Sequence, residues 1–235
     1  MGPTSVHGLL PEFTFQPTSL LLHGSNRALL NWVMFAVLDR SHPGFWWTDV
    51  RLREERLDPL DPLARHVIPE DHLGVIAPTV LQREPDRSAT LATMIRPDEP
   101  PPSLQRVMEF LRLPKHTQEL ISSRPATKRP AQVALSNCHR LAAIFPAGSV
   151  EPTVRAILAS GVSLALTWAD ALPASAQHFD FVLGVEGSGP ANWQQATLHC
   201  EIGNSSGLAR AGQRFKLGEL RPIAEVLGPM GLAAP

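Results

Sequence analysis

Short apolar runs alternate with helical patterns along the first half of the chain. The run at residues 19–24 ends in glycine and predicts a buried strand followed by a tight turn. Residues 26–38 are apolar nearly all round, which is typical of a buried helix. Runs at residues 45–48 and 73–78 predict two more strands, and residues 51–65 predict a loop leading into a short helix. The alternation favours a parallel sheet covered by helices on both faces.

The second half continues this alternation and then becomes richer in strands. Residues 132–136 and 162–167 predict a fourth and a fifth strand. Residues 179–185 and 196–202 predict a late antiparallel pair, and residues 215–217 predict a last short strand. Helical spacing of apolar residues is found in the stretches 103–111, 140–145 and 153–160.

The composition is that of a single globular domain over residues 1–235. Of the 235 residues, 43% are hydrophobic and 18% are charged, which is enough for one full-sized core. Residues 81–102 are polar and rich in proline, and they predict a surface excursion. Residues 219–235 predict a C-terminal tail.

Charge and hydropathy exclude several classes of protein. The net charge is −1 and the pI is about 6.8, so no overall positive field attracts nucleic acid. No stretch reaches the roughly 20 apolar residues that a membrane helix needs. We therefore expect a cytoplasmic protein with no membrane partner. Cys138 and Cys200 lack the spacing of metal or redox motifs and predict buried, reduced thiols.

Six stretches of the chain follow one another in a fixed order: GLLPEFTFQPTSLLLHG, WTDVRLREERLDPLDPLARHVIPEDHLGVIAP, QVALSN, GVSLALTWADALPASAQHFDFVLGVEG, ATLHCEIGNSSG and FKLG. Their order and spacing resemble the RecA, RadA and KaiC-like ATPase core over residues 8–218. The resemblance implies an α/β fold of the RecA type. Such a fold is a three-layer sandwich, with a mostly parallel central sheet, late antiparallel strands and helices on both faces.

The resemblance places a phosphate-binding loop after the first strand, but the residues of that loop are missing. A working loop needs glycines whose amides converge on phosphate, a lysine, and a serine or threonine for magnesium. Counted from Gly24, the pattern G-x-x-x-x-G-K-[ST] ends on the Leu-Leu-Asn of residues 29–31. Aligned on the next apolar residues, it ends on Ser25, Asn26 and Arg27, and the loop is about four residues short.

Two further positions depart from the family in the same sense. The acidic residue at the end of the fourth strand falls on Asn137, a neutral amide that orients magnesium-bound water poorly. The catalytic glutamate after the second strand falls on Arg51, close to Asp49, and a cation cannot act as a general base. The resemblance therefore implies a pseudo-ATPase with no catalytic residue, no cofactor and no bound metal.

Histidines and a cysteine form clusters for which structural roles are the simpler interpretation. His66 and His72 flank two acidic residues, but Pro69 breaks the helix that would bring both rings to one face. We therefore expect a solvated turn there. Adjacent Cys138 and His139 point in different directions, so we expect a core cysteine and no thiol nucleophile. Four residues near the carboxyl edge of the sheet suggest a ligand pocket: Trp168, Asp170, Trp193 and Glu201.

One basic stretch, at residues 106–140, offers a different kind of partner. It contains the loop SSRPATKRP, in which Arg124, Lys128 and Arg129 are the candidate contacts to DNA phosphates. No aromatic residue lies within that loop to stack on bases, so a solvated face is the simpler interpretation.

The sequence therefore leads to one functional hypothesis and two alternatives. The leading hypothesis is a non-catalytic module for protein interaction, scaffolding or regulation, which binds a protein partner or forms a homo-oligomer through its RecA-like faces. The first alternative is a nucleic-acid-binding mediator of recombination or repair. The second is a protein that binds a nucleotide in an unconventional way.

Overall fold

The computed structural model describes a central sheet and segments beside it. The expected excursion at residues 81–102, the expected helices at 103–111 and 153–160 and nearly all of the tail lie outside the described residues. In the described part of the chain, no helix is long and apolar enough to cross a membrane. The described residues are 18–38, 45–52, 56–77, 113, 115, 119, 132–141, 163–203 and 210–219.

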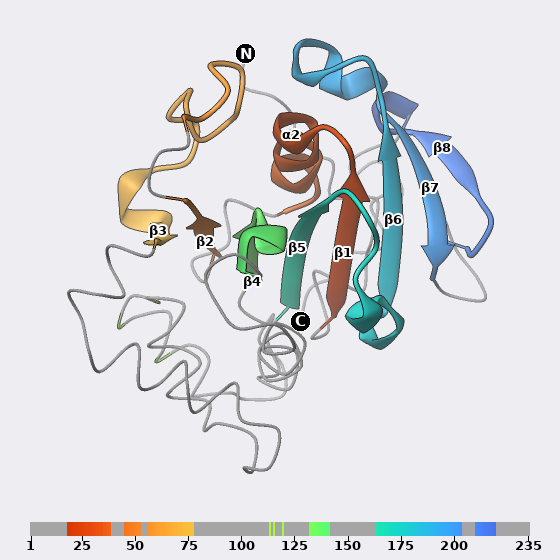
Figure 1. Cartoon of the computed structure of the whole chain (residues 1–235), viewed down its shortest axis with the longest axis horizontal. Helices are drawn as coiled ribbons and strands as arrows, with labels where there is room; N and C mark the ends of the chain where they lie inside the picture. Colours follow the sequence, from red (N-terminus) through yellow and green to blue (C-terminus); the bar gives the residue numbers. More distant parts are fainter. Residues whose placement is uncertain are drawn as a thin grey trace, which may run out of the picture.

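One mixed sheet of eight strands forms the centre of the molecule (Figure 1). The strands are β1 (Ser19–Gly24), β2 (Phe45–Val50), β3 (Leu73–Ile76), β4 (Gln132–Ser136), β5 (Ser163–Ala169), β6 (Phe181–Glu186), β7 (Thr197–Ile202) and β8 (Arg214–Lys216). Their order in the sheet is β3-β2-β4-β5-β1-β6-β7-β8. The first six strands in this order, from β3 at the edge through to β6, run parallel to one another. Strand β7 is antiparallel to both of its neighbours, β6 and β8.

This architecture confirms the expected fold class, an α/β protein with a mostly parallel sheet and late antiparallel strands. Every strand that the apolar runs predict is present. The second strand extends to Val50, beyond the predicted 45–48. The late pair is also joined to the rest of the sheet, because β6 pairs in parallel with β1 on its other side.

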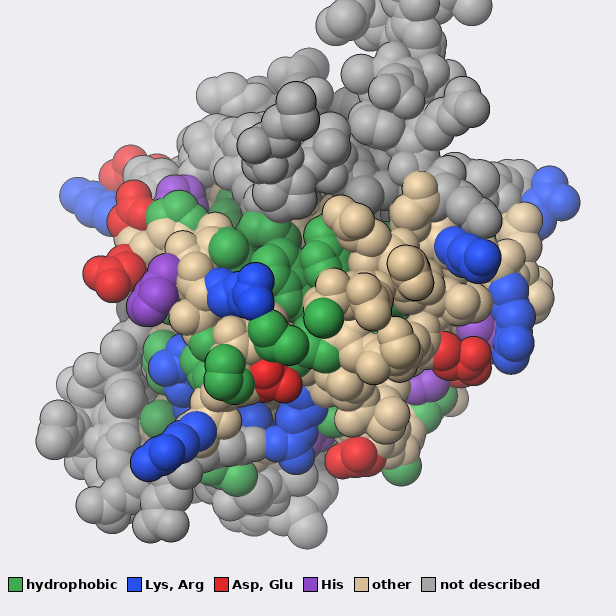
Figure 2. Space-filling model, turned by 90° about the horizontal axis from the view of Figure 1, so that it is seen from above, with side chains coloured by type: hydrophobic (Ala, Val, Ile, Leu, Met, Phe, Trp, Pro, Cys, Tyr) green, Lys and Arg blue, Asp and Glu red, His purple; other side chains and the backbone are tan. Residues whose placement is uncertain are grey.

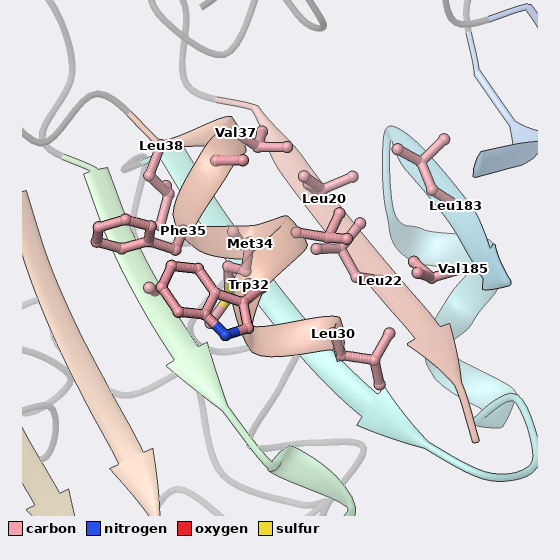
Figure 3. Close-up of a cluster of buried hydrophobic side chains, with 14 of the residues drawn as sticks. Leu20, Leu22, Leu30, Trp32, Met34, Phe35, Val37, Leu38, Leu183 and Val185 are labelled. Carbon is pink, nitrogen blue, oxygen red and sulfur yellow. The ribbon is translucent and has the colours of Figure 1, made fainter. Parts of the chain in front are cut away.

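Helix α2 (Arg27–Val37) packs on one face of the sheet and is buried over almost its whole length. Asn26 begins the helix, and its Oδ1 accepts a hydrogen bond from the backbone N–H of Leu29 at 3.0 Å. All residues of α2 after the first are buried. Figure 3 shows the side chains of α2 beside Leu20 and Leu22 of β1, with which they form one core cluster.

Two loops contact the helix outside the sheet, which explains why α2 is apolar nearly all round. Trp32 stacks on Trp193 of the 3-10 helix Pro190–Gln195, with ring centroids 5.4 Å apart and an angle of 7° between the planes. The Nε1 of Trp32 also donates to the carbonyl oxygen of Leu60 at 2.6 Å. Loops from two distant parts of the sequence therefore bury the same tryptophan.

The segment at residues 56–66 forms turns where the sequence predicted a short helix. Asp58 Oδ1 accepts from the amide of Leu60 at 2.8 Å, and Asp61 Oδ1 accepts from the amide of Leu63 at 2.9 Å. Aspartates that bond to the backbone two residues ahead stabilise turns and compete with helix. A proline follows each of these aspartates and disfavours helical backbone at the residue before it.

The end of β1 passes very close to β6 at Gly24. A Cβ at this position would lie 2.6 Å from the carbonyl oxygen of Val185. We expect Gly24→Ala to lower the free energy of unfolding by about 2 kcal/mol, because the backbone must shift. Denaturant unfolding followed by circular dichroism measures this. Ser25→Ala, at the next and exposed position, is the control, and equal stability of Gly24→Ala and the wild type would contradict the prediction.

Candidate functional site

The carboxyl ends of the parallel strands meet at one edge of the sheet, beside the start of α2 (Figure 1). Open α/β sheets bind ligands at this edge. Only Ser25 and Asn26 connect β1 to α2. Because the Asn26 side chain takes the amide of Leu29, this connection is a helix cap. The backbone of Gly24 lies close to that of Val185, and no second glycine stands in this connection to form a glycine-rich loop.

A pocket of about 650 Å³ opens at this edge. The start of α2, the turn segment and the residues that follow β4 line it. Figure 2 looks onto this edge of the molecule and shows basic and acidic side chains close together there. The charged residues that line the pocket are Arg27, Arg56, Arg140, Asp58 and Asp61.

A fully buried carboxylate, Asp49 of β2, lies at the same edge. Its Oδ1 accepts from Ser136 Oγ at 2.6 Å and from Asn137 Nδ2 at 2.7 Å. Its Oδ2 accepts from Arg51 Nε at 2.5 Å. Both oxygens of the carboxylate therefore bind donors, and Arg51 supplies the opposite charge.

The hydrogen bonds continue from Asn137 towards the helix. Asn137 follows β4 in a left-handed conformation, and its backbone N–H donates to Thr167 Oγ1 at 2.8 Å. The Thr167 hydroxyl donates to Asn31 Oδ1 at 3.3 Å, and Asn31 Nδ2 donates to Asp61 Oδ2 at 2.8 Å. Three strands, α2 and the turn segment thus share one buried polar network, which consists of Asp49, Ser136, Asn137, Thr167, Asn31 and Asp61.

Asp61 is the last residue of this network and lines the pocket, and its pKa differs from that of an ordinary aspartate. Burial is the largest of the causes that raise the pKa of Asp61 to about 6. Hydrogen bonds from Leu63 and Asn31 oppose the shift, whereas the charges of Asp49 and Asp58 add to it. Asp61 therefore exchanges its proton close to neutral pH, as groups at functional sites often do.

The residues at this edge do not fit the magnesium nucleotide of a working RecA-like ATPase. Arg51 and Asn137 occupy the oxygens through which Asp49 would bind a cation or its water. The connection between β1 and α2 contains no lysine. Among the described residues, no group of three or more His, Cys, Asp or Glu side chains is placed to hold a metal ion. This geometry supports no catalytic step through a bound magnesium ion.

The four residues around which the sequence suggested a ligand pocket do not belong to the pocket described above. Trp193 packs on Trp32, and Glu201 Oε1 lies 2.9 Å from His23 Nε2. Alternation along the strands places Ala169 in the core cluster with α2, so Trp168 points to the opposite face. None of the expected four lines the pocket of about 650 Å³: Trp168, Asp170, Trp193 and Glu201.

The other residues that the sequence singled out have separate partners. Cys138 donates through Sγ to a backbone carbonyl of β4, and burial raises its pKa well above the usual range, which makes it a poor nucleophile. His139 Nδ1 accepts from the amide of Ala169 at 3.3 Å. His72 Nδ1 lies 2.8 Å from the carbonyl oxygen of Phe45. Both cysteines are buried and free, as expected.

Arg124, Lys128 and Arg129 lie outside the described residues. The nucleic-acid interface therefore stays a prediction from the sequence.

Sequence reasoning missed three residues that shape the pocket: Arg56, Asp61 and Arg140. One signal was available, because Asn31 is the only polar residue inside an apolar helical run. A polar side chain in such a position needs a buried partner, and here the partners are Thr167 and Asp61.

Comparisons with known proteins found similarity among solved structures only. No family model matches the chain, and no curated protein matches it. Among solved structures, the chain is similar to a KaiC-like protein from the hyperthermophilic archaeon Pyrococcus horikoshii OT3. The two share 11% sequence identity with a TM-score of 0.44, and the similarity covers 86% of this chain and 85% of the other. This likeness concerns the fold alone.

The raised pKa of Asp61 predicts a specific dependence of stability on pH. Because the folded state binds the proton more tightly than the unfolded chain, this group stabilises the fold as pH falls from about 6 to about 4. We expect the wild type to gain of the order of 2 kcal/mol over Asp61→Asn across this range. Urea unfolding at several pH values measures the difference. Asp58→Asn, in the same turn segment, is the control, and a difference that does not change with pH would contradict the prediction.

The contact between Asn137 and Asp49 predicts how an acidic residue at position 137 would change the stability of the fold. Asn137→Asp would place a second carboxylate at the hydrogen-bond distance of 2.7 Å from Asp49. We expect the variant to lose about 2–4 kcal/mol of stability at neutral pH and to recover part of it in acid. Chemical denaturation measures this, with the exposed Asn192→Asp as the control. Unchanged stability at neutral pH would show that Asp49 does not sense the residue at position 137.

Proposed function

We propose that this chain is a RecA/KaiC-like pseudo-ATPase that has lost its phosphate-binding loop and acts as a non-catalytic module for protein interaction, scaffolding or regulation. The observation that carries the proposal is the set of hydrogen bonds that the buried Asp49 carboxylate accepts. Its oxygens bind Arg51, Ser136 and Asn137, and two of these residues, Arg51 and Asn137, stand at the positions where the resemblance expects the acidic residues of an ATPase.

The connection before α2 supports the same conclusion. Phosphate binding at a helix start depends on backbone amides that point at the ligand. Here the side chain of Asn26 takes the Leu29 amide, and Gly24 lies against the carbonyl of Val185. The described residues nevertheless form a sheet of eight strands with a buried core. A retained scaffold with a modified edge fits a protein that presents surfaces to a protein partner or to copies of itself.

The first test is ATP turnover by the purified protein with magnesium. We expect no release of phosphate above the buffer level, in the wild type or in Asp49→Asn. The variant is the matched control, because a contaminating ATPase would give the same rate in both preparations. Turnover by the wild type that is lost in a folded Asp49→Asn variant would overturn the proposal.

The interaction role needs a separate measurement. Size-exclusion chromatography with light scattering, over a wide range of concentrations, should show a homo-oligomer, or a pull-down should recover a stoichiometric protein partner. A strict monomer with no recovered partner would overturn the scaffold role, even if turnover is absent.

A further inference from the structure

Three arginines from three separate segments line the pocket at the sheet edge. Arg27 begins α2, Arg56 precedes the turns, and Arg140 ends the 3-10 helix Cys138–Arg140. Arg27 and Arg56 are exposed. Arg140 is only 6% exposed, and its Nη1 donates to the carbonyl oxygen of Val50 at 2.8 Å. A guanidinium that is held in this way is oriented before any ligand arrives, which lowers the entropic cost of binding.

Two carboxylates in the lining offset part of this positive charge. Asp58 is exposed and accepts from the amide of Leu60. Asp61 is 3% exposed, and its oxygens accept from the Leu63 amide and from Asn31 Nδ2. Three guanidinium groups against two carboxylates leave the lining positive, and a proton on Asp61 makes it more so.

The charge of Asp61 is the variable one in this set, because burial and neighbouring carboxylates raise its pKa to about 6. The charged and polar groups that act on Asp61 or line the pocket with it belong to four parts of the fold. They are Arg56 and Asp58 from its own segment, Arg27 and Asn31 from α2, Asp49 from β2, and Asn137 and Arg140 after β4.

We propose that this pocket binds a small, doubly charged oxyanion through Arg27, Arg56 and Arg140, and that protonation of Asp61 converts it to the high-affinity state. Guanidinium groups bind oxyanions through paired, charge-assisted hydrogen bonds. An ionised carboxylate in the same lining repels the ligand, whereas a neutral carboxyl group does not. The inference goes beyond the proposed function, because it assigns the pocket a ligand that is bound and not converted.

Sulfate is the probe, because it keeps its double charge throughout the range in which Asp61 titrates. We expect calorimetry at constant ionic strength to show sulfate binding roughly tenfold tighter at about pH 5 than at about pH 8. In Asp61→Asn, the ratio of the two affinities should shrink to the small value set by the overall charge, because the variant is neutral at both pH values. Arg56→Gln should weaken binding at acid pH by about tenfold.

Arg214→Gln is the matched control for the loss of an arginine, because Arg214 is an exposed residue of β8 outside the pocket. Thermal melts establish that each variant is folded. The proposal is overturned if sulfate does not bind at acid pH, if Arg56→Gln binds it as well as Arg214→Gln does, or if Asp61→Asn keeps the wild-type dependence on pH. ATP turnover would overturn the pseudo-ATPase proposal and leave these sulfate results unchanged, so the two failures are distinguishable.

Discussion

The buried carboxylate of Asp49 is the charge on which the carboxyl edge of the sheet depends. Enclosing an ion in a protein interior is costly unless an opposite charge and hydrogen-bond donors accompany it. Arg51 supplies the charge, and Ser136 and Asn137 supply donors, so side chains as well as backbone hold the ends of β2 and β4 together. Removing one donor leaves a buried acceptor without a partner, which costs more than losing an exposed hydrogen bond.

The same network determines how α2 sits on the sheet. The apolar side chains of this helix fill the core but specify its rotation only through their shapes. Asn31 adds directional bonds, because it accepts from Thr167 of β5 and donates to Asp61 of the turn segment. The helix start, the turns and the strand ends that line the pocket are therefore positioned by one set of hydrogen bonds.

The strands were predictable because each is a short apolar run with a clear break, and Arg51 and Asn137 could be placed because each follows its strand directly. The contact of Asn137 with Asp49 could not be predicted, since it requires β2 and β4 to be neighbours and periodicity carries no information on strand order. The position of Asp61 was missed for another reason. Local aspartate–backbone bonds make turns of a segment whose sequence predicted a helix.

The placement of the first strand in the middle of the sheet has a consequence for biosynthesis. Leu20 is paired with Ala165 on one side and with Phe181 on the other. A ribosome needs on the order of ten seconds to add the residues between them. During that interval the apolar strand β1 lacks β5 and β6, the two strands between which it lies in the folded protein. The pairing of β1 is therefore completed only late in synthesis, and until then its apolar residues are exposed to aggregation or to chaperones.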